Sequence, residues 1–215
     1  MNEATNIRSL LGGCRVLPVV TAQTVKSTVQ LTQTLFDGGM RAVEITLRTE
    51  AALDSIRAVK AEVPDILVAA GTVTNPEDLE RAMDAGADFC VSPGVTERLL
   101  RAAAEARVDF VPGVATASEI LLGMDYGFRC FKLFPAVAVG GLQLIKSLSG
   151  PFPDLQFCPT GGLNASNFRE FLALPNVICC GGSWMVADAL VSAGKWPQME
   201  ELAREAMAAG DQSPS

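Results

Sequence analysis

Short apolar runs of β type recur along the chain at nearly regular intervals. Each is rich in Val, Ile, Phe or Cys and leads into Gly, Pro or Thr, which is typical of a buried strand followed by a turn. The runs begin about 20 to 26 residues apart, a near-fixed period of the kind that marks repeated units. They are RVLPVV from residue 15, RAVEITL from 41, ILVAAGT from 66, DFCVSPG from 88, DFVPGVA from 109, RCFKLFP from 129, LQFCPTGG from 155 and NVICCGG from 176.

Segments with apolar residues at helical spacing separate these runs. One of them, TNPEDLERAMDAGA, opens with a Thr/Asn cap and Pro76 and closes on Gly86, as a short helix does. The others end in glycine, proline or a basic residue in a similar way. The predicted helices fall within residues 24–39, 49–64, 74–87, 95–107, 136–150 and 164–175.

Eight strand–helix units predict a parallel α/β fold, and eight is the number of strands that closes a (β/α)8 TIM barrel. The 215 residues suit a single domain over 1–215, with an N-terminal helix in 1–13 and a tail at 210–215 that we expect to be disordered. An open doubly wound sheet is the alternative. That fold would need a phosphate loop early in the chain, and the first unit, VLPVVTAQT, has none.

Composition narrows the functional classes. Apolar residues make up 49% and charged residues 19%, which is ordinary for a globular protein, and no uninterrupted apolar stretch is long enough to predict a membrane span. The N-terminus lacks the order of a signal peptide. A net charge of -7 argues against nucleic-acid binding. We therefore expect a cytoplasmic protein that acts on small molecules.

Six cysteines and no histidine constrain the chemistry further. No C-x-x-C pair is present, so we interpret the cysteines as buried free thiols in a reducing compartment. The absence of histidine removes the commonest general base and the commonest metal ligand. We predict no metal and no cofactor, and we expect acid–base work to fall to carboxylates, Lys, Tyr or Cys.

Polar residues gather where the predicted strands end, which is the functional face of a barrel of this type. In RAVEITLRT, Glu44, Thr46 and Arg48 alternate with apolar residues, so we place them on the lumen face. A structural Glu–Arg pair is the alternative interpretation, and a buried ion pair is weak evidence for stability alone. The row is therefore a candidate for chemistry.

Lys132 lies in the apolar run FKLFPA, where a lysine is unexpected. If Phe131 and Leu133 face the helices, Lys132 points into the lumen and can meet Glu44. An edge lysine in water is the alternative, but a closed barrel has no edge strand. A lumenal lysine beside a carboxylate indicates Schiff-base chemistry. The amine must be neutral to react. Apolar neighbours and Arg48 disfavour its charge whereas Glu44 favours it, so we expect the first two to prevail only if Glu44 keeps its distance, for example through a water.

Two glycine pairs follow the last two predicted strands. TGG precedes the helix-like NASN, and GGS precedes WMVADAL. Backbone N–H groups at adjoining strand ends, near helix N-termini, can cradle a phosphate, although tight turns alone would also use glycine. The candidate cradle comprises Gly161, Gly162, Gly181, Gly182 and Ser183.

The segments VEITLRTE, AAGTV, SPGVTE, FKLFPA, CPTGGL and GGSW resemble the motifs of the KHG/KDPG aldolases, in the family's order and from about residue 14 to about residue 208. The resemblance implies a (β/α)8 barrel, usually trimeric and metal-free, that acts as a lyase in the Entner–Doudoroff pathway. The chain departs from the family at Val137, because members often carry Glu after FPA. KDPG here is 2-keto-3-deoxy-6-phosphogluconate and KHG is 4-hydroxy-2-oxoglutarate.

The resemblance also implies roles for individual residues. Lys132 is expected to form the Schiff base and Glu44 to act as general acid and base. The remaining residues are expected to bind substrate: Arg48 and Thr72 at the pyruvyl carboxylate, Pro93 and Phe134 along the site, Thr160 at the substrate hydroxyls, and the two glycine loops with Ser183 at the phosphate. The implied reaction is cleavage of KDPG to pyruvate and glyceraldehyde 3-phosphate, with KHG as a second substrate. The implied assembly is a homotrimer.

Other functions remain open at this stage. A sister aldolase could act on the galactonate epimer or mainly on the non-phosphorylated substrate, and Thr160 favours the gluconate enzyme. A non-catalytic barrel that binds a phosphorylated metabolite would keep the glycine loops but would not need Lys132 and Glu44. A metal-dependent pyruvate aldolase is disfavoured by the missing histidines.

Overall fold

In the computed structural model, which describes residues 7–208, every predicted β run contains a strand. The run from residue 109 contains two short strands that flank Pro112. All ladders between strands are parallel. The strands are β1 (Val16–Thr21), β2 (Ala42–Thr46), β3 (Leu67–Gly71), β4 (Phe89–Val91), β5 (Phe110–Val111), β6 (Gly113–Val114), β7 (Cys130–Leu133), β8 (Gln156–Pro159) and β9 (Cys180–Gly182).

Helices occupy the predicted intervals, and side-chain caps explain where several of them begin. Thr24, Asn75 and Thr96 each accept a hydrogen bond from a backbone N–H in the first turn, and Pro76 stands at the start of α4. Thr116 and Glu119 form a reciprocal capping box on α6, a helix absent from the predicted set. The helices are α1 (Ile7–Leu11), α2 (Val25–Asp37), α3 (Ala52–Glu62), α4 (Pro76–Asp84), α5 (Glu97–Ala106), α6 (Ala117–Asp125), α7 (Gly141–Leu148), α8 (Phe168–Leu172), the 3-10 turn η1 (Trp184–Val186), α9 (Asp188–Ser192) and α10 (Trp196–Ala208).

The strands form a curled parallel sheet of six, in the order β5-β4-β3-β2-β1-β9, and a second sheet of three, in the order β6-β7-β8. Neighbouring strands follow chain order, and the last strand pairs with the first, as a doubly wound sheet would not do. The predicted single eight-stranded barrel is therefore seen only in part. The ladder is interrupted at Pro112, which has no N–H to donate, and β8 meets the β9 segment only at isolated bridges.

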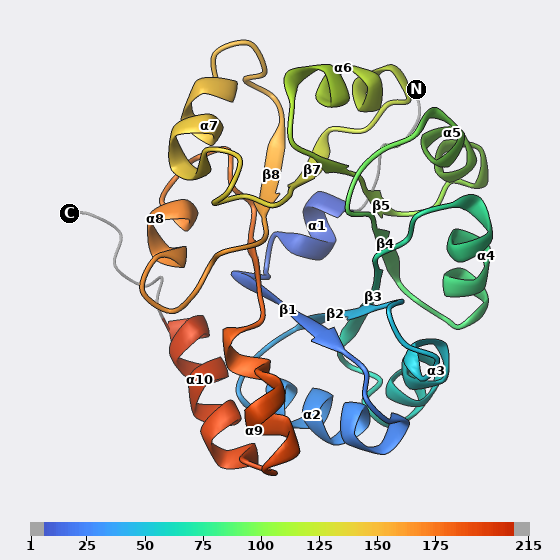
Figure 1. The fold of residues 1–215 in the computed structure, drawn as a ribbon, viewed down its shortest axis with the longest axis vertical. Coiled ribbons are helices and arrows are strands. Elements are labelled where there is room, and N and C mark those ends of the chain that lie inside the picture. The colour runs from blue at the N-terminus through green and yellow to red at the C-terminus, as the bar shows by residue number, and fades with distance from the viewer. Residues whose placement is uncertain (1–6, 209–215) are drawn as a thin grey trace.

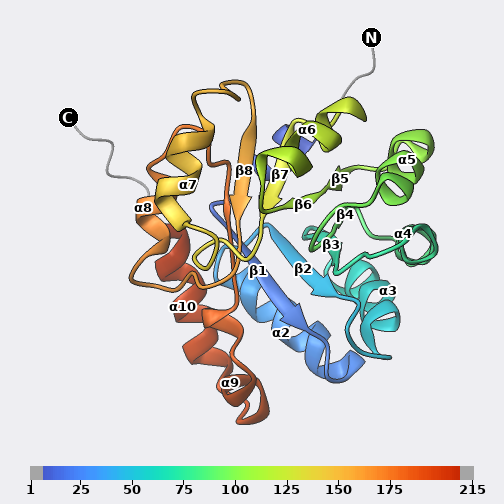
Figure 2. The same ribbon diagram turned by 45° about the horizontal axis from the view of Figure 1, so that its top comes forward.

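Two apolar cores lie on opposite faces of the strands. The larger one packs Val43, Ile45, Phe131 and Leu133 against the surrounding helices. The smaller one fills the interior between the strands and includes two residues of α1. Figure 1 shows α1 near the middle of the molecule, and both Figure 1 and Figure 2 show the other helices outside the strands. The smaller core consists of Ile7, Leu11, Cys14, Leu17, Ala42, Ala69, Phe89, Val91, Val111, Cys130, Cys158 and Cys179.

Helix α1 covers one end of the interior between the strands, and we call this interior the lumen. Several residues of the small core, such as Leu17, Ala42 and Cys130, stand at or near the start of their strands, and the same core includes two residues of α1. Polar side chains from the later parts of the strands lie at the opposite end of the lumen. The predicted N-terminal helix corresponds to α1, whereas the tail at 210–215 lies outside the described residues. Between residues 7 and 208, no helix has the length and apolar character needed to cross a membrane.

Candidate functional site

Lys132 and Glu44 form a buried ion pair in the lumen. Lys132 lies on β7 and Glu44 on β2, and their side chains are only 7% and 1% exposed. The lysine Nζ lies 2.9 Å from Oε1 and 3.2 Å from Oε2 of the carboxylate. Glu44 therefore does not keep the distance that we set as the condition for a neutral amine. Two charges held away from solvent attract strongly, so direct contact offsets more of the cost of burying them than a separated arrangement would.

Strand alternation explains why these two charges point inward. Val43 and Ile45, on either side of Glu44, pack in the outer core, and so do Phe131 and Leu133 on either side of Lys132. Successive residues of a strand face opposite sides, so the central residue of each triplet must face the lumen. The geometry of the pair is therefore a direct consequence of the local sequence.

Gly71, at the end of β3, makes room for the carboxylate. A Cβ at this position would overlap Oε1 of Glu44, and β3 pairs with β2 in register there. Only glycine leaves this space without shifting the strand. Sequence reasoning missed this residue, although the AAGT segment in which it lies was among the motifs considered.

Arg48 lies in the turn after β2, not on the strand itself, which ends at Thr46. Its Nε donates to Thr46 Oγ1 at 3.0 Å, and one terminal nitrogen donates to Thr21 Oγ1 at 2.8 Å. The Thr46 hydroxyl in turn donates to the Val20 carbonyl at 3.0 Å. Two hydroxyls thus aim the exposed guanidinium at the carboxyl end of β1 and β2. Neither threonine was among the predicted binding residues.

The next strand ends contribute Thr72, Pro93 and Phe134. Thr72 directly follows β3 and has a φ of 60°, a left-handed conformation that is unfavourable for a β-branched residue. Such strain is concentrated at ligand-binding positions. Pro93 follows β4 by two residues. The Lys132 ammonium lies 5.5 Å from the centre of the Phe134 ring, within range of a cation–π interaction.

Thr160 and the glycine loops lie beside one another at the ends of β8 and β9. Thr160 and Gly181 form an isolated parallel bridge, and a Cβ on Gly181 would overlap the Thr160 hydroxyl. Gly161 and Gly162 have φ values of 97° and 82°, which glycine adopts readily. Ala136 N–H donates to the Thr160 carbonyl at 2.7 Å, so the segment after β7 also holds this loop in place.

The helices expected to begin directly after these loops, with their N-termini toward a bound phosphate, are short or start farther away than predicted. α8 begins only at Phe168, and the segment after β9 is the three-residue turn η1, which starts next to Ser183. A short helix carries little dipole, so any anion bound here would depend on the N–H groups of the loops themselves. Gly182 is confined by the ring of Trp184, while Ser183 is exposed.

The geometry thus brings together one amine, one carboxylate and one guanidinium at the carboxyl ends of the strands. Over residues 7–208, no three His, Cys, Asp or Glu side chains are grouped as a metal site would require. The chemistry available from the chain itself is nucleophilic addition by an amine, with proton transfer by a carboxylate at hydrogen-bond distance.

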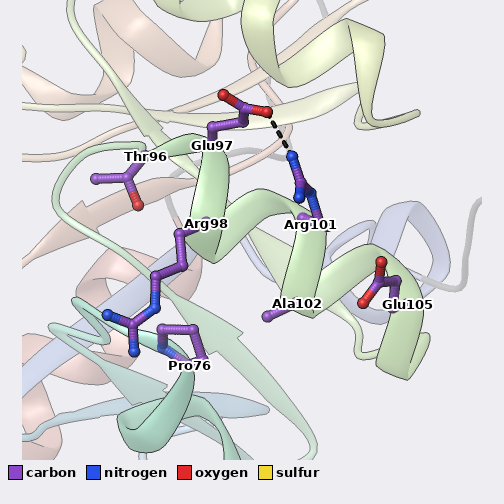
Figure 3. A pocket seen from close by; sticks show the side chains of 7 residues that line it. All are labelled: Pro76, Thr96, Glu97, Arg98, Arg101, Ala102 and Glu105. Carbon is purple, nitrogen blue, oxygen red and sulfur yellow. Dashed lines mark hydrogen bonds and ion pairs between the residues drawn. The ribbon is translucent and has the colours of Figure 1, made fainter.

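A separate hollow of about 550 Å³ lies on the outer helical layer, and Figure 3 shows the side chains that line it. It lies between the start of α4 and the exposed side of α5, where Arg101 donates to Glu97 at 2.5 Å. It shares no residue with the site above. Exposed charge pairs of this kind are ordinary solvated surface and contribute little to stability. Its lining residues are Pro76, Thr96, Glu97, Arg98, Arg101, Ala102 and Glu105.

The family model described as "KDPG and KHG aldolase" matches residues 7–202 of the chain. A KHG/KDPG aldolase of Escherichia coli K12 is 46% identical over 206 residues, which cover 96% of this chain and 97% of that protein.

Two solved structures are similar over nearly the whole chain. A KDPG aldolase from Legionella pneumophila, with pyruvate captured as a covalent carbinolamine, is 39% identical with a TM-score of 0.90 and covers 93% of this chain and 97% of its own. The KDPG aldolase of Zymomonas mobilis ZM4 with 3-phosphoglycerate is 38% identical with a TM-score of 0.88 and covers 94% and 96%.

Replacing Gly71 by alanine tests whether this position makes room for the carboxylate. The added methyl group must displace Glu44 or the β3 backbone, so we expect Gly71→Ala to lower the free energy of unfolding by about 1–3 kcal/mol in denaturant titrations. Gly13 has open space around its Cα. Gly13→Ala is the matched control and should change stability by no more than about 0.5 kcal/mol. Equal effects of the two substitutions would contradict the interpretation.

Proposed function

Because this chain belongs to the KDPG and KHG aldolase family, we propose that it cleaves KDPG to pyruvate and glyceraldehyde 3-phosphate through an imine on Lys132. It is an aldolase, and so a lyase. The observation that carries the mechanism is the buried Lys132–Glu44 pair at 2.9 Å. A family relative that holds pyruvate as a carbinolamine supports a covalent route.

Lys132 acts as the nucleophile once it has given up a proton. Glu44 is in direct contact and takes that proton without an intervening water. The neutral amine then adds to the C2 ketone of the substrate to form a carbinolamine. Glu44, now protonated, returns its proton to the departing hydroxyl, and water leaves. The product is a protonated imine between C2 and Nζ, which serves as an electron sink.

Cleavage uses the same carboxylate a second time. Glu44 accepts the proton of the C4 hydroxyl, the C3–C4 bond breaks, and its electron pair moves toward the imine nitrogen. Glyceraldehyde 3-phosphate departs and an enamine of pyruvate remains. Glu44 then protonates C3, and hydrolysis of the resulting imine releases pyruvate and restores the Lys132 amine. One carboxylate can serve all four proton transfers because it stays within reach of Nζ.

The other predicted residues bind the two ends of the substrate in this proposal. Arg48 and Thr72 hold the pyruvyl carboxylate, while Pro93 and Phe134 line the walls. Thr160 contacts the hydroxyls and favours the gluconate over the galactonate epimer. The phosphate rests on the N–H groups of the cradle, which is formed by Gly161, Gly162, Gly181, Gly182 and Ser183. KHG, a keto acid without phosphate, is proposed as a second substrate, in keeping with the name of the Escherichia coli relative.

We also propose that the two sheets together make one closed (β/α)8 barrel and a single domain. Two features support closure. A single residue, Pro112, separates β5 of the first sheet from β6 of the second, and Thr160 forms a bridge to Gly181 that links the two sheets on the other side. A homotrimer in the cytoplasm completes the proposal. The six buried free cysteines fit a reducing compartment, and the trimer follows from the family resemblance. Sedimentation equilibrium of the intact protein tests the trimer.

Lys132→Ala should abolish cleavage, because no imine can then form. Treating the unmodified protein with pyruvate and borohydride should add one reduced pyruvyl group, detected by intact mass and peptide mapping. Lys146 lies on α7, away from the lumen, and Lys146→Ala should be labelled as the unmodified protein is. An adduct on Lys26, Lys60, Lys146 or Lys195 would sink the assignment.

Arg48→Lys should raise the KM for pyruvate in the condensation direction by about tenfold, since lysine cannot reproduce a planar two-pronged contact with a carboxylate. The same variant should retain borohydride labelling at saturating pyruvate, because Lys132 is unaffected. An unchanged KM would mean that the carboxylate is held elsewhere.

Ser183→Asp should separate the two substrates. A carboxylate beside the cradle repels a phosphate dianion, and even with partial screening by water the penalty should lower kcat/KM on KDPG by about tenfold or more. Cleavage of KHG places no phosphate there and should fall much less. Measuring both rates on one variant cancels any general loss of folded protein. Equal losses would show that Ser183 shapes the whole site and not a dedicated phosphate cradle.

A further inference from the structure

A pair of thiols lies directly beneath the candidate site. Cys179 Sγ donates a hydrogen bond to Cys158 Sγ at a distance of 3.2 Å, and both side chains are buried in the lumen. Cys158 is the register partner of Lys132 across β7 and β8. Its sulfur also lies 3.9 Å from the hydroxyl of Thr160, two residues farther along the same strand face. The proposed mechanism uses neither cysteine.

The pair spans a discontinuity between the two sheets. Phe157 bridges Val177 and Thr160 bridges Gly181, and no continuous ladder joins these two bridges. Between these bridges, one segment contributes residues 158–159 and the other contributes 178–180, so one side has an extra residue. An extra residue of this kind bends a strand and leaves local backbone unpaired. The two sulfurs therefore face each other where the pairing of the two segments is irregular.

From this geometry we propose that Cys158 and Cys179 are a site of reversible oxidation by peroxides, and that the disulfide they form lowers turnover. The thiolate of Cys158 attacks one peroxide oxygen, the O–O bond breaks, and Cys158 becomes a sulfenic acid as hydroxide leaves. The Cys179 thiol then attacks that sulfur and displaces a second hydroxide, which its proton neutralises. Two thiols lose two electrons, the peroxide gains two, and two waters form with one further proton.

The surroundings favour Cys158 as the attacking sulfur. The hydrogen bond from Cys179 is the main cause that lowers the pKa of Cys158. Lys132 and the Thr160 hydroxyl act in the same direction, against the opposing effects of burial and of the Glu44 carboxylate. The other thiols are disfavoured as anions. Burial raises the pKa of Cys14 to about 11 and those of Cys90 and Cys130 to about 12. The thiolate is the reactive form, so oxidation should begin at Cys158.

Disulfide formation should distort the site above it. An S–S bond is about 2.05 Å long, so the two sulfurs must approach by roughly 1.1 Å from their present separation. A shift of the segment that carries Cys179 reaches the site, because Thr160 bridges Gly181 two residues farther along that segment and even a Cβ on Gly181 would overlap the Thr160 hydroxyl. Packed interiors transmit such displacements to their neighbours. The Thr160 hydroxyl and the two glycine loops should shift, and a displacement of about 1 Å in a positioning group can slow a reaction about 100-fold.

The test treats the intact enzyme with hydrogen peroxide, removes the excess with catalase, and compares samples before and after reduction with dithiothreitol. We expect the mass to fall by about two units as two hydrogens are lost, with peptide mapping linking Cys158 to Cys179. We expect kcat/KM to fall about tenfold or more and to recover on reduction. The mass change is independent of the proposed aldolase activity, on which the turnover readout rests.

Neighbouring cysteines provide matched variants. Cys179→Ala removes the second thiol and should prevent both the cross-link and the reversible loss of turnover. Cys180 is the adjacent residue, but its sulfur faces the outer core, where it donates to the Phe168 carbonyl at 3.6 Å. Cys180→Ala should therefore respond to peroxide as the unmodified enzyme does.

Several results would overturn the proposal. These are a fully reduced protein after prolonged peroxide treatment, a cross-link between other cysteines, addition of oxygens to Cys158 without a cross-link, or a cross-link that leaves turnover unchanged. Mapping of the unmodified enzyme decides the first three even if a variant folds poorly. An equal, reversible loss in the Cys179→Ala and Cys180→Ala variants would also contradict it.

Discussion

The ion pair between Lys132 and Glu44 is the constraint around which the interior of this molecule is organised. Burying an ammonium and a carboxylate costs several kcal/mol for each ion, and only close contact with further polar support offsets that cost. The pair is held from opposite parts of the chain, 88 residues apart, on strands whose flanking residues are anchored in the outer core. An arrangement that costs this much folding free energy is understandable if the amine and the carboxylate are needed together for chemistry.

Much of this arrangement was readable in the sequence. The alternation in RAVEITL and RCFKLFP placed Glu44 and Lys132 on the inner face, because the period of a strand is two and both flanks are apolar. Six of the helices, α2 to α5 with α7 and α8, were predictable from their caps and from their glycine, proline or basic ends, whereas α6 was missed. The parallel pairing of strands that are consecutive in the chain followed from the regular spacing of the units. Each of these inferences depends on interactions that are local in the chain.

What the sequence left undetermined depends on contacts between distant segments. Whether Lys132 and Glu44 touch or stay apart was left open, because direct pairing is set by how β2 and β7 face each other across the lumen. The role of Gly71 depends on a carboxylate from the neighbouring strand. The break at Pro112 could have been anticipated from its missing N–H, but the weak junction between β8 and β9 arises from a residue-count mismatch between two bridges.

Glycines at the ends of the strands explain why the side chains of the candidate site are closely positioned and why small displacements should disturb them. Gly71 lies against the Glu44 carboxylate, Gly181 against Thr160, and a side chain on Gly113 would overlap the backbone at Pro93. Backbone therefore approaches functional side chains without intervening methyl groups, which positions them closely but leaves no compressible layer. A change of about 1 Å deeper in the lumen cannot be absorbed there. The sulfur pair lies where strand pairing is discontinuous and within one side-chain layer of Thr160, so chemistry at the sulfurs is coupled mechanically to the site.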